Sequence, residues 1–175
     1  YESSTKPTEF KKLLFSLAFF HATILERRKF GAIGWNIPYE WMNSDFETCL
    51  KQLKMYLDDQ AEVPYVTLRF LISEINYGGR VTDDKDVRLI TSLLSKYFAV
   101  EAIDEKYKFS PSGIYYAPPA GTLDDVREYI NNLPLEDDPE VFGLHPNANI
   151  TFQQKTVQEF MSTLLNVNPK ASDKG

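Results

Sequence analysis

The fold is decided by residues 13–39, which read LLFSLAFFHATILERRKFGAIGWNIPY. They contain one apolar helix face, because large apolar residues recur at three- and four-residue spacing: Leu13, Leu14, Leu17, Phe20, Ile24 and Leu25. The other side of the same helix is apolar too, through Phe15, Ala18, Phe19 and Ala22. A helix that is apolar all round is normally buried by its neighbours. The sequence therefore predicts a buried central helix that opens at Pro7 and runs to about Lys29.

The central helix closes on four charged residues, Glu26-Arg27-Arg28-Lys29. Cations in a last turn suit the negative end of the helix dipole, so a solvated helix end is the simpler interpretation and an ionic contact with a partner is the alternative. Gly31 follows, where a left-handed cap is easiest without a Cβ atom. An ordered loop rich in Trp and Tyr comes next, and its rings must pack either in the core or against a neighbouring surface.

Five further helices are predicted from capping and breaking signals: from Ser44 with Glu47 as a capping box, from Pro64 to Gly78-Gly79, from Thr82 to Phe98, from Thr122 to Leu133, and from Thr151 with Gln154 as a second capping box to Pro169. Aromatic residues around a Ser110-Pro111-Ser112-Gly113 turn predict a short extended or hairpin excursion near residues 105–118. The expected fold is mainly α, a bundle of about six helices. We expect one helical domain over residues 7–168, with flexible tails at residues 1–6 and 169–175.

Composition excludes several classes of protein. A net charge of −6 and a pI near 5.0 argue against nucleic acid as a partner. Cys49 is the single cysteine, so no internal disulfide forms, and with only His21 and His145 beside it a structural zinc site is not expected. Lys11-Lys12 before an apolar run superficially resembles a signal peptide, but the run is too short to span a bilayer and lacks a cleavage site. The sequence opens at Tyr1 rather than Met, which suggests a piece of a longer polypeptide.

No catalytic group of residues emerges from the motifs. The phosphate-binding glycine patterns are missing, and Gly78-Gly79-Arg80 at a helix start is the one candidate for a phosphate contact, against the simpler interpretation of a helix terminator with a surface or interface arginine. His21 is interpreted as a core or interface histidine and His145 as a turn residue. Nothing near Cys49 in the sequence would activate its thiol. Asp83, Asp84 and Asp86 are interpreted as first-turn acids rather than metal ligands.

Four strings taken together resemble one family: FFHATILERRKFGAIGWNIPYEW at 19–41, EINYGGRVTDDKDVRLI at 74–90, YKFSPSGIYYAPP at 107–119 and FGLHPNANITFQQ at 142–154. They closely resemble dynein heavy chains, in the part described as the lid of the sixth AAA+ module. The resemblance runs from about Phe10 to Leu165 in the same order and spacing. The string SPSGIYYAPP is more similar to axonemal than to cytoplasmic dyneins.

The resemblance implies a helical, non-catalytic piece of a ring-shaped, ATP-driven, minus-end-directed microtubule motor in a cilium or flagellum. It implies that ATP and Mg²⁺ bind elsewhere in the parent, and that no cofactor or metal binds this piece. Neighbouring AAA+ subdomains and the C-terminal domain of the same heavy chain are the implied contacts, while the parent binds microtubules and the intermediate and light chains of dynein; no nucleic acid or membrane is implied. Arg80 corresponds loosely to the arginine with which AAA+ lids sense phosphate.

A second class of function competes with this one. A free-standing helical adaptor would bind a partner peptide in an apolar groove. It would show one exposed apolar groove, whereas a motor module would show several contact surfaces. An enzyme with His21 or His145 as the base is a third possibility and requires a carboxylate and a nucleophile beside the histidine.

Overall fold

The computed structural model describes residues 5–119, 121–136, 138–144 and 148–167. Within these residues it contains six α-helices and no strand, so the expectation of a mainly α fold is confirmed. The α-helices are α1 (Pro7–Arg27), α2 (Asn43–Asp59), α3 (Tyr65–Phe70), α4 (Asp84–Tyr97), α5 (Leu123–Asn131) and α6 (Ala148–Val167). Short helical segments join them: η1 (Arg28–Ile33), the π-helix η2 (Leu71–Asn76), η3 (Gly78–Arg80), η4 (Val100–Ile103) and η5 (Pro139–Phe142).

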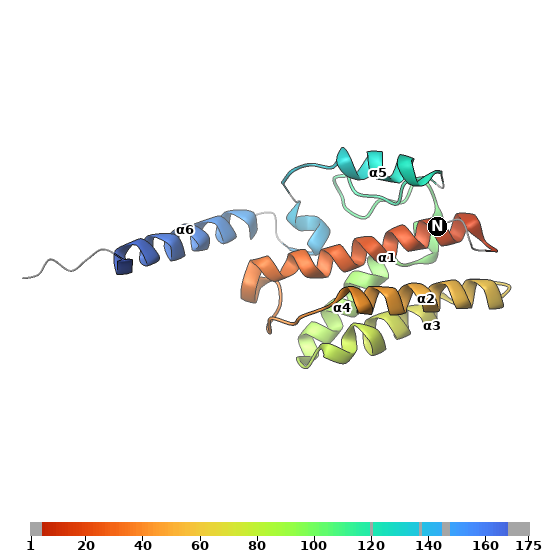
Figure 1. Ribbon diagram of the computed structural model, residues 1–175, viewed down its shortest axis with the longest axis horizontal. Coiled ribbons are helices and arrows are strands. Elements are labelled where there is room, and N and C mark those ends of the chain that lie inside the picture. Colours follow the sequence, from red (N-terminus) through yellow and green to blue (C-terminus); the bar gives the residue numbers. More distant parts are fainter. Residues whose placement is uncertain (1–4, 120, 137, 145–147, 168–175) are drawn as a thin grey trace, which may run out of the picture.

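Helix α1 lies at the centre of the molecule, as the sequence predicts. Figure 1 shows α2, α3 and α4 along one side of it and α5 on the other, and α1 contacts α2, α4, η4 and η5 directly. Its face with Leu13, Leu17 and Ile24 is fully buried. The packed neighbours therefore cover most of the apolar circumference that the sequence displays.

The start of α2 differs from the prediction. The helix begins at Asn43, so Ser44 lies inside it and the expected capping box from Ser44 to Glu47 is wrong. The Asp45 carboxylate instead accepts a hydrogen bond from the backbone N–H of Met42, at 2.8 Å. Asp45, at the third position of the helix, therefore takes the role expected of Glu47, because its carboxylate reaches back to Met42, the residue before the helix.

Two other helix starts were predicted from Thr residues, with different outcomes. Helix α4 is capped by Asp83 rather than Thr82, because the Asp83 carboxylate accepts from two backbone N–H groups of the first turn. Helix α5 is capped by Thr122 as predicted, and Asp125 accepts from the Thr122 backbone N–H at 2.9 Å. Asp and Thr are both good caps. In Thr82-Asp83 the cap is Asp83, because it is the residue that lies directly before the helix with an extended backbone.

The predicted helix between Pro64 and Gly78 forms in two parts. α3 begins one residue after Pro64, and the chain then widens into the π-helix η2. Gly78 ends this run, since a Cβ atom there would lie 2.0 Å from the carbonyl oxygen of Ser73. A glycine is therefore required at this position for the close backbone approach, which agrees with its predicted role as a stop.

The excursion near residues 105–118 is extended, as expected, but it does not form a ladder. Its turn is closed by two backbone hydrogen bonds, from the Phe109 N–H to the Tyr115 carbonyl at 2.8 Å and from the Gly113 N–H to the Ser110 carbonyl at 3.1 Å, and Gly113 takes a φ of 73°. Phe19 of α1 receives the arm, with ring centroids 5.0 Å from Phe109 and 5.7 Å from Tyr115. The arm is held by aromatic packing rather than by pairing of strands.

Helix α6 leaves the body of the molecule in Figure 1. It begins at Ala148, so the residues of the capping box predicted at Thr151 and Gln154 lie inside the helix and that prediction is wrong. His145, Pro169 and most of the predicted tails lie outside the described residues. In the part of the chain that the structure describes, no helix is both long and apolar enough to cross a membrane.

Candidate functional site

The loop after α1 is a compact aromatic cluster rather than an exposed patch. Trp35, Tyr39 and Trp41 are each 5% exposed or less, and their ring centroids lie 5.0 to 6.2 Å apart. The Trp35 indole donates to the carbonyl of Ile24 in α1, and the Trp41 indole donates to the carbonyl of Tyr77 after η2, both at 3.1 Å. Both tryptophans therefore belong to the core, which settles the choice between core and contact surface.

A buried carboxylate fixes this loop to α4. Asp86 is 2% exposed, and it accepts hydrogen bonds from the Tyr39 hydroxyl at 2.8 Å and from the backbone N–H of Asn36 at 3.1 Å. Burial raises the pKa of Tyr39, so its hydroxyl remains a donor across the neutral range. Asp84 is a first-turn acid as predicted and Asp83 is the cap of α4, whereas Asp86 is both a first-turn acid and a buried link between two segments of the chain.

Arg27 is buried, so the prediction of a solvated helix end is wrong for this residue, although Glu26, Arg28 and Lys29 are exposed as expected. The residue is 4% exposed, and its Nε donates a hydrogen bond to the carbonyl of Gly34 at 2.6 Å. Its Nη1 donates to the carbonyl of Phe142 in η5, and its guanidinium lies 5.6 Å from the Trp35 ring centroid. Burial lowers the pKa of Arg27 to about 10, which still leaves it cationic at neutral pH.

The sequence contains signals for both of these groups. Arg27 lies seven residues after Phe20 and three after Ile24, so it shares the buried face of α1. Asp86 lies four residues before Ile90, on the buried face of α4. Periodicity places both residues inward, but it does not identify the carbonyl, hydroxyl and amide groups that satisfy them.

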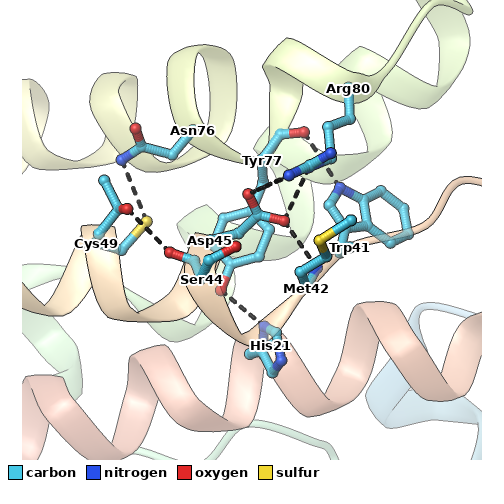
Figure 2. Close-up of polar contacts among 10 residues, drawn as sticks. His21, Trp41, Met42, Ser44, Asp45, Cys49, Asn76, Tyr77 and Arg80 are labelled. Carbon is cyan, nitrogen blue, oxygen red and sulfur yellow. Dashed lines mark hydrogen bonds and ion pairs between the residues drawn. The ribbon is translucent and has the colours of Figure 1, made fainter.

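Arg80, the candidate phosphate contact, is paired with a carboxylate of its own chain. Figure 2 shows its guanidinium against Asp45, with Nε 2.9 Å from one carboxylate oxygen and Nη2 3.1 Å from the other. The same carboxylate holds the Met42 N–H at the start of α2. The Arg80 side chain is 39% exposed, so one side of the guanidinium remains open to solvent. The structure thus joins η3 to α2 at this point.

The other two candidates in Figure 2 are bonded within the fold. His21 Nδ1 lies 2.8 Å from the Tyr77 hydroxyl, and burial lowers the pKa of His21. Cys49 is fully buried and accepts from the Asn76 amide at 3.2 Å, and burial raises the pKa of its thiol to about 12. These contacts link α1, α2 and η2, and a thiol that burial keeps protonated is a poor nucleophile.

An apolar groove of about 400 Å³ runs between α1 and α5 and ends at η5. Its floor is the outer face of α1, where Ala18 and Ala22 are exposed. Its other wall is the apolar stripe of α5. The lining residues are Lys11, Leu14, Phe15, Ala18, Phe19, Ala22, Thr23, Glu26, Tyr115, Leu123, Val126, Ile130, Leu133, Val141 and Phe142. The all-round burial expected for α1 therefore fails on this one face. Among the described residues, no group of three or more His, Cys, Asp or Glu side chains is placed to hold a metal ion.

Comparison with known proteins places these features in a family. The family model for the dynein heavy chain AAA lid domain matches residues 10–148. The chain is 45% identical to human dynein axonemal heavy chain 6 over 100% of its length, 47% identical to human dynein axonemal heavy chain 1 over 99%, and 47% identical to mouse dynein axonemal heavy chain 3 over 100%. It spans about 4% of the length of each of these relatives. The predicted resemblance to dynein heavy chains is confirmed, and this chain belongs to the dynein heavy chain AAA lid domain family.

Proposed function

We propose that this chain is the lid of the sixth AAA+ module of an axonemal dynein heavy chain and acts as a non-catalytic coupling module. In this proposal it links that module to its ring neighbours and to the C-terminal domain, in an ATP-driven, minus-end-directed motor. The parent heavy chain would bind ATP and Mg²⁺ in other modules, and it would bind microtubules and dynein intermediate and light chains. The relatives are axonemal heavy chains, which indicates the axoneme of a cilium or flagellum as the location.

The observation that carries the coupling role is an exposed apolar stripe on α6. The stripe consists of five residues with exposed fractions between 47% and 69%: Val157, Phe160, Met161, Leu164 and Leu165. They recur at three- and four-residue spacing, so they share one helix face. An apolar face of this kind marks a surface that contacts another protein segment. The stripe lies on a helix that extends from the body of the molecule. The buried groups Arg27 and Asp86 join the segments of that body, so a force on α6 would act on connected segments.

The contacts of Arg80 favour a structural role over a phosphate-sensing one. The Asp45 carboxylate already takes two of its N–H groups, and a phosphate would compete with that carboxylate for them. We therefore propose that Arg80 holds η3 on α2 and uses its open side for contact with a neighbouring subdomain. The fragment itself would hydrolyse nothing, and the motor's chemistry would lie in other modules.

The rival hypothesis, a free-standing adaptor, is less well supported. Each relative named above carries this segment as about 4% of a much longer polypeptide. The apolar groove that the adaptor hypothesis expects is nevertheless present between α1 and α5.

The coupling role is tested in the full-length heavy chain. Phe160→Ser with Leu164→Ser removes two exposed apolar side chains, so the helix loses its contact surface without a cavity opening in the core. We expect microtubule gliding to slow while the ATPase rate is kept, because chemistry and movement become uncoupled. The matched control is Gln158→Ser with Ser162→Ala, two exposed polar residues of the same helix. Equal gliding speeds in the wild type and the stripe variant would refute the role.

A further inference from the structure

The groove between α1 and α5 leaves two apolar helix faces exposed. On α5, Leu123 and Ile130 line the groove and are exposed. On α1, Ala18 and Ala22 line it and are exposed, and their small side chains leave room above the helix. The lining contains one Lys and one Glu among apolar residues, so an uncharged apolar face suits it best, because an unpaired charge buried there would cost free energy.

The stripe on α6 is a second exposed apolar face of the same chain. α6 carries one Lys and one Glu and is neutral. In proteins, an amphipathic helix gains most of its stability when its apolar face packs on another element. The stripe covers residues 157–165 and the groove floor covers residues 14–22, so each rises over about 12 Å of helix. The two faces therefore match in length and in their lack of charge.

The connection between the groove and α6 is short. The groove ends at η5, whose Val141 and Phe142 belong to its lining. Arg27, in the last turn of α1, donates to the Phe142 carbonyl, so this end of the groove lies beside the C-terminal end of α1. Helix α6 begins at Ala148, six residues after Phe142. Because connections of about two to eight residues join neighbouring helices in bundles, α6 is able to lie antiparallel to α1 in the groove.

We propose that this chain has a closed form, in which α6 turns back at Gly143 and its stripe fills the groove between α1 and α5. Gly143 follows η5 with a φ of 70°, and glycine reaches backbone conformations that other residues avoid, which suits a pivot. Figure 1 shows the open form, in which α6 extends from the body. The closed form covers the stripe and so withholds it from a ring neighbour of the heavy chain. This regulatory consequence rests on the proposed function, whereas the closed form itself does not.

The test is photo-crosslinking in this 175-residue chain, with benzoylphenylalanine in place of Phe160. This replacement keeps an aromatic ring in the stripe. We expect it to capture groove residues of α1 or α5 in the same molecule, which a mixture of isotopically light and heavy chains distinguishes from capture between molecules. Ser162, exposed on the same helix but outside the stripe, is the control position and should capture neither helix. Capture between molecules, capture elsewhere on the body, or no capture would overturn the proposal.

A charge on the groove floor tests the same contact from its other side. Ala22→Glu alters an exposed residue, so the core is kept, but the closed form would bury the new carboxylate under the stripe. The intramolecular crosslink from position 160 should lose yield several-fold. Met55→Glu introduces the same charge on the exposed side of α2 and should leave the yield unchanged. Equal yields in the two variants would overturn the proposal.

The crosslink and the gliding assay can fail separately. If the intramolecular crosslink is absent while Phe160→Ser with Leu164→Ser slows gliding, the closed form fails and the coupling role stands. If the crosslink forms while gliding is unaffected, the closed form stands, and its regulatory consequence fails together with the coupling role.

Discussion

Tyr39→Phe removes a single oxygen from the bond that fixes the aromatic loop to α4. The Tyr39 hydroxyl donates to the buried Asp86 carboxylate at 2.8 Å and accepts from the Asp83 N–H at 3.1 Å. The ring keeps its volume, so packing against Trp35 and Trp41 is unchanged. The variant therefore isolates the polar contribution of this contact.

The cost follows from the charge and burial of the acceptor. A hydrogen bond to a charged group contributes about 1.5–3 kcal/mol, and Asp86 is 2% exposed, so water cannot replace the donor easily. We expect Tyr39→Phe to lower the free energy of unfolding by about 1.5–3 kcal/mol. For a domain of this size, that corresponds to a fall in Tm of about 3–12 °C.

Urea unfolding of this chain, followed by circular dichroism, measures the change. Tyr56→Phe is the matched control, because Tyr56 is a half-buried ring for which no hydroxyl hydrogen bond is found in the described part of the chain; its change should stay below about 0.5 kcal/mol. A double-mutant cycle with Asp86→Asn should give a coupling energy of about 1 kcal/mol or more. A loss for Tyr39→Phe no larger than the control's, or a coupling near zero, would refute the argument that Asp86 fixes the loop.

Three further predictions concern the junction in Figure 2. Burial lowers the pKa of His21 below 6.5, so as the pH falls the unfolded chain binds a proton on this histidine before the folded chain does. The stability that neutral His21 contributes is therefore complete above pH 6.5 and is lost as the pH falls below it. Thermal melts from about pH 7.5 to about 5.5 should show a smaller loss of stability in His21→Gln than in the wild type. Cys49, with its pKa raised to about 12, should react with Ellman's reagent near pH 8 only when denaturant opens the fold, and rapid native labelling would contradict its burial. Asp45→Ala removes both a helix cap and the partner of Arg80, so it should lower the free energy of unfolding in urea by about 1–2 kcal/mol. Arg80→Ala should leave the chain folded and lower this free energy by about 1 kcal/mol or less. The reverse order would assign the stability to Arg80 itself.

The sequence predicts the helices better than it predicts their ends. Periodicity over residues 13–25 is long and unambiguous, and α1 forms there as expected. The ends depend on single backbone conformations, and α2 shows the difficulty, since Ser44 has the right type for a cap while Asp45 has the right position. When two neighbouring residues have similar capping ability, the way the preceding loop approaches the helix determines which of them forms the cap.

The polar junctions were beyond sequence reasoning for a different reason. A positive charge at a helix end, such as that of Arg27, is already explained by the helix dipole. The sequence therefore gives no reason to expect that the carbonyls of Gly34 and Phe142 accept hydrogen bonds from its guanidinium. Phe142 lies 115 residues away along the chain, and no local pattern reports such a contact. The place of the groove could not be predicted from the sequence either, because the apolar side of α1 predicts burial whether or not a neighbour covers it.

We propose that this lid domain couples its neighbours mechanically and binds no nucleotide. The most direct test is the melting temperature of the chain with and without millimolar Mg-ATP or Mg-ADP, since a ligand bound only by the folded state must raise it. We predict no change with either nucleotide, for the wild type and for Arg80→Ala alike. A saturable rise in the wild type that Arg80→Ala abolishes would contradict the claim and assign phosphate binding to Gly78-Gly79-Arg80.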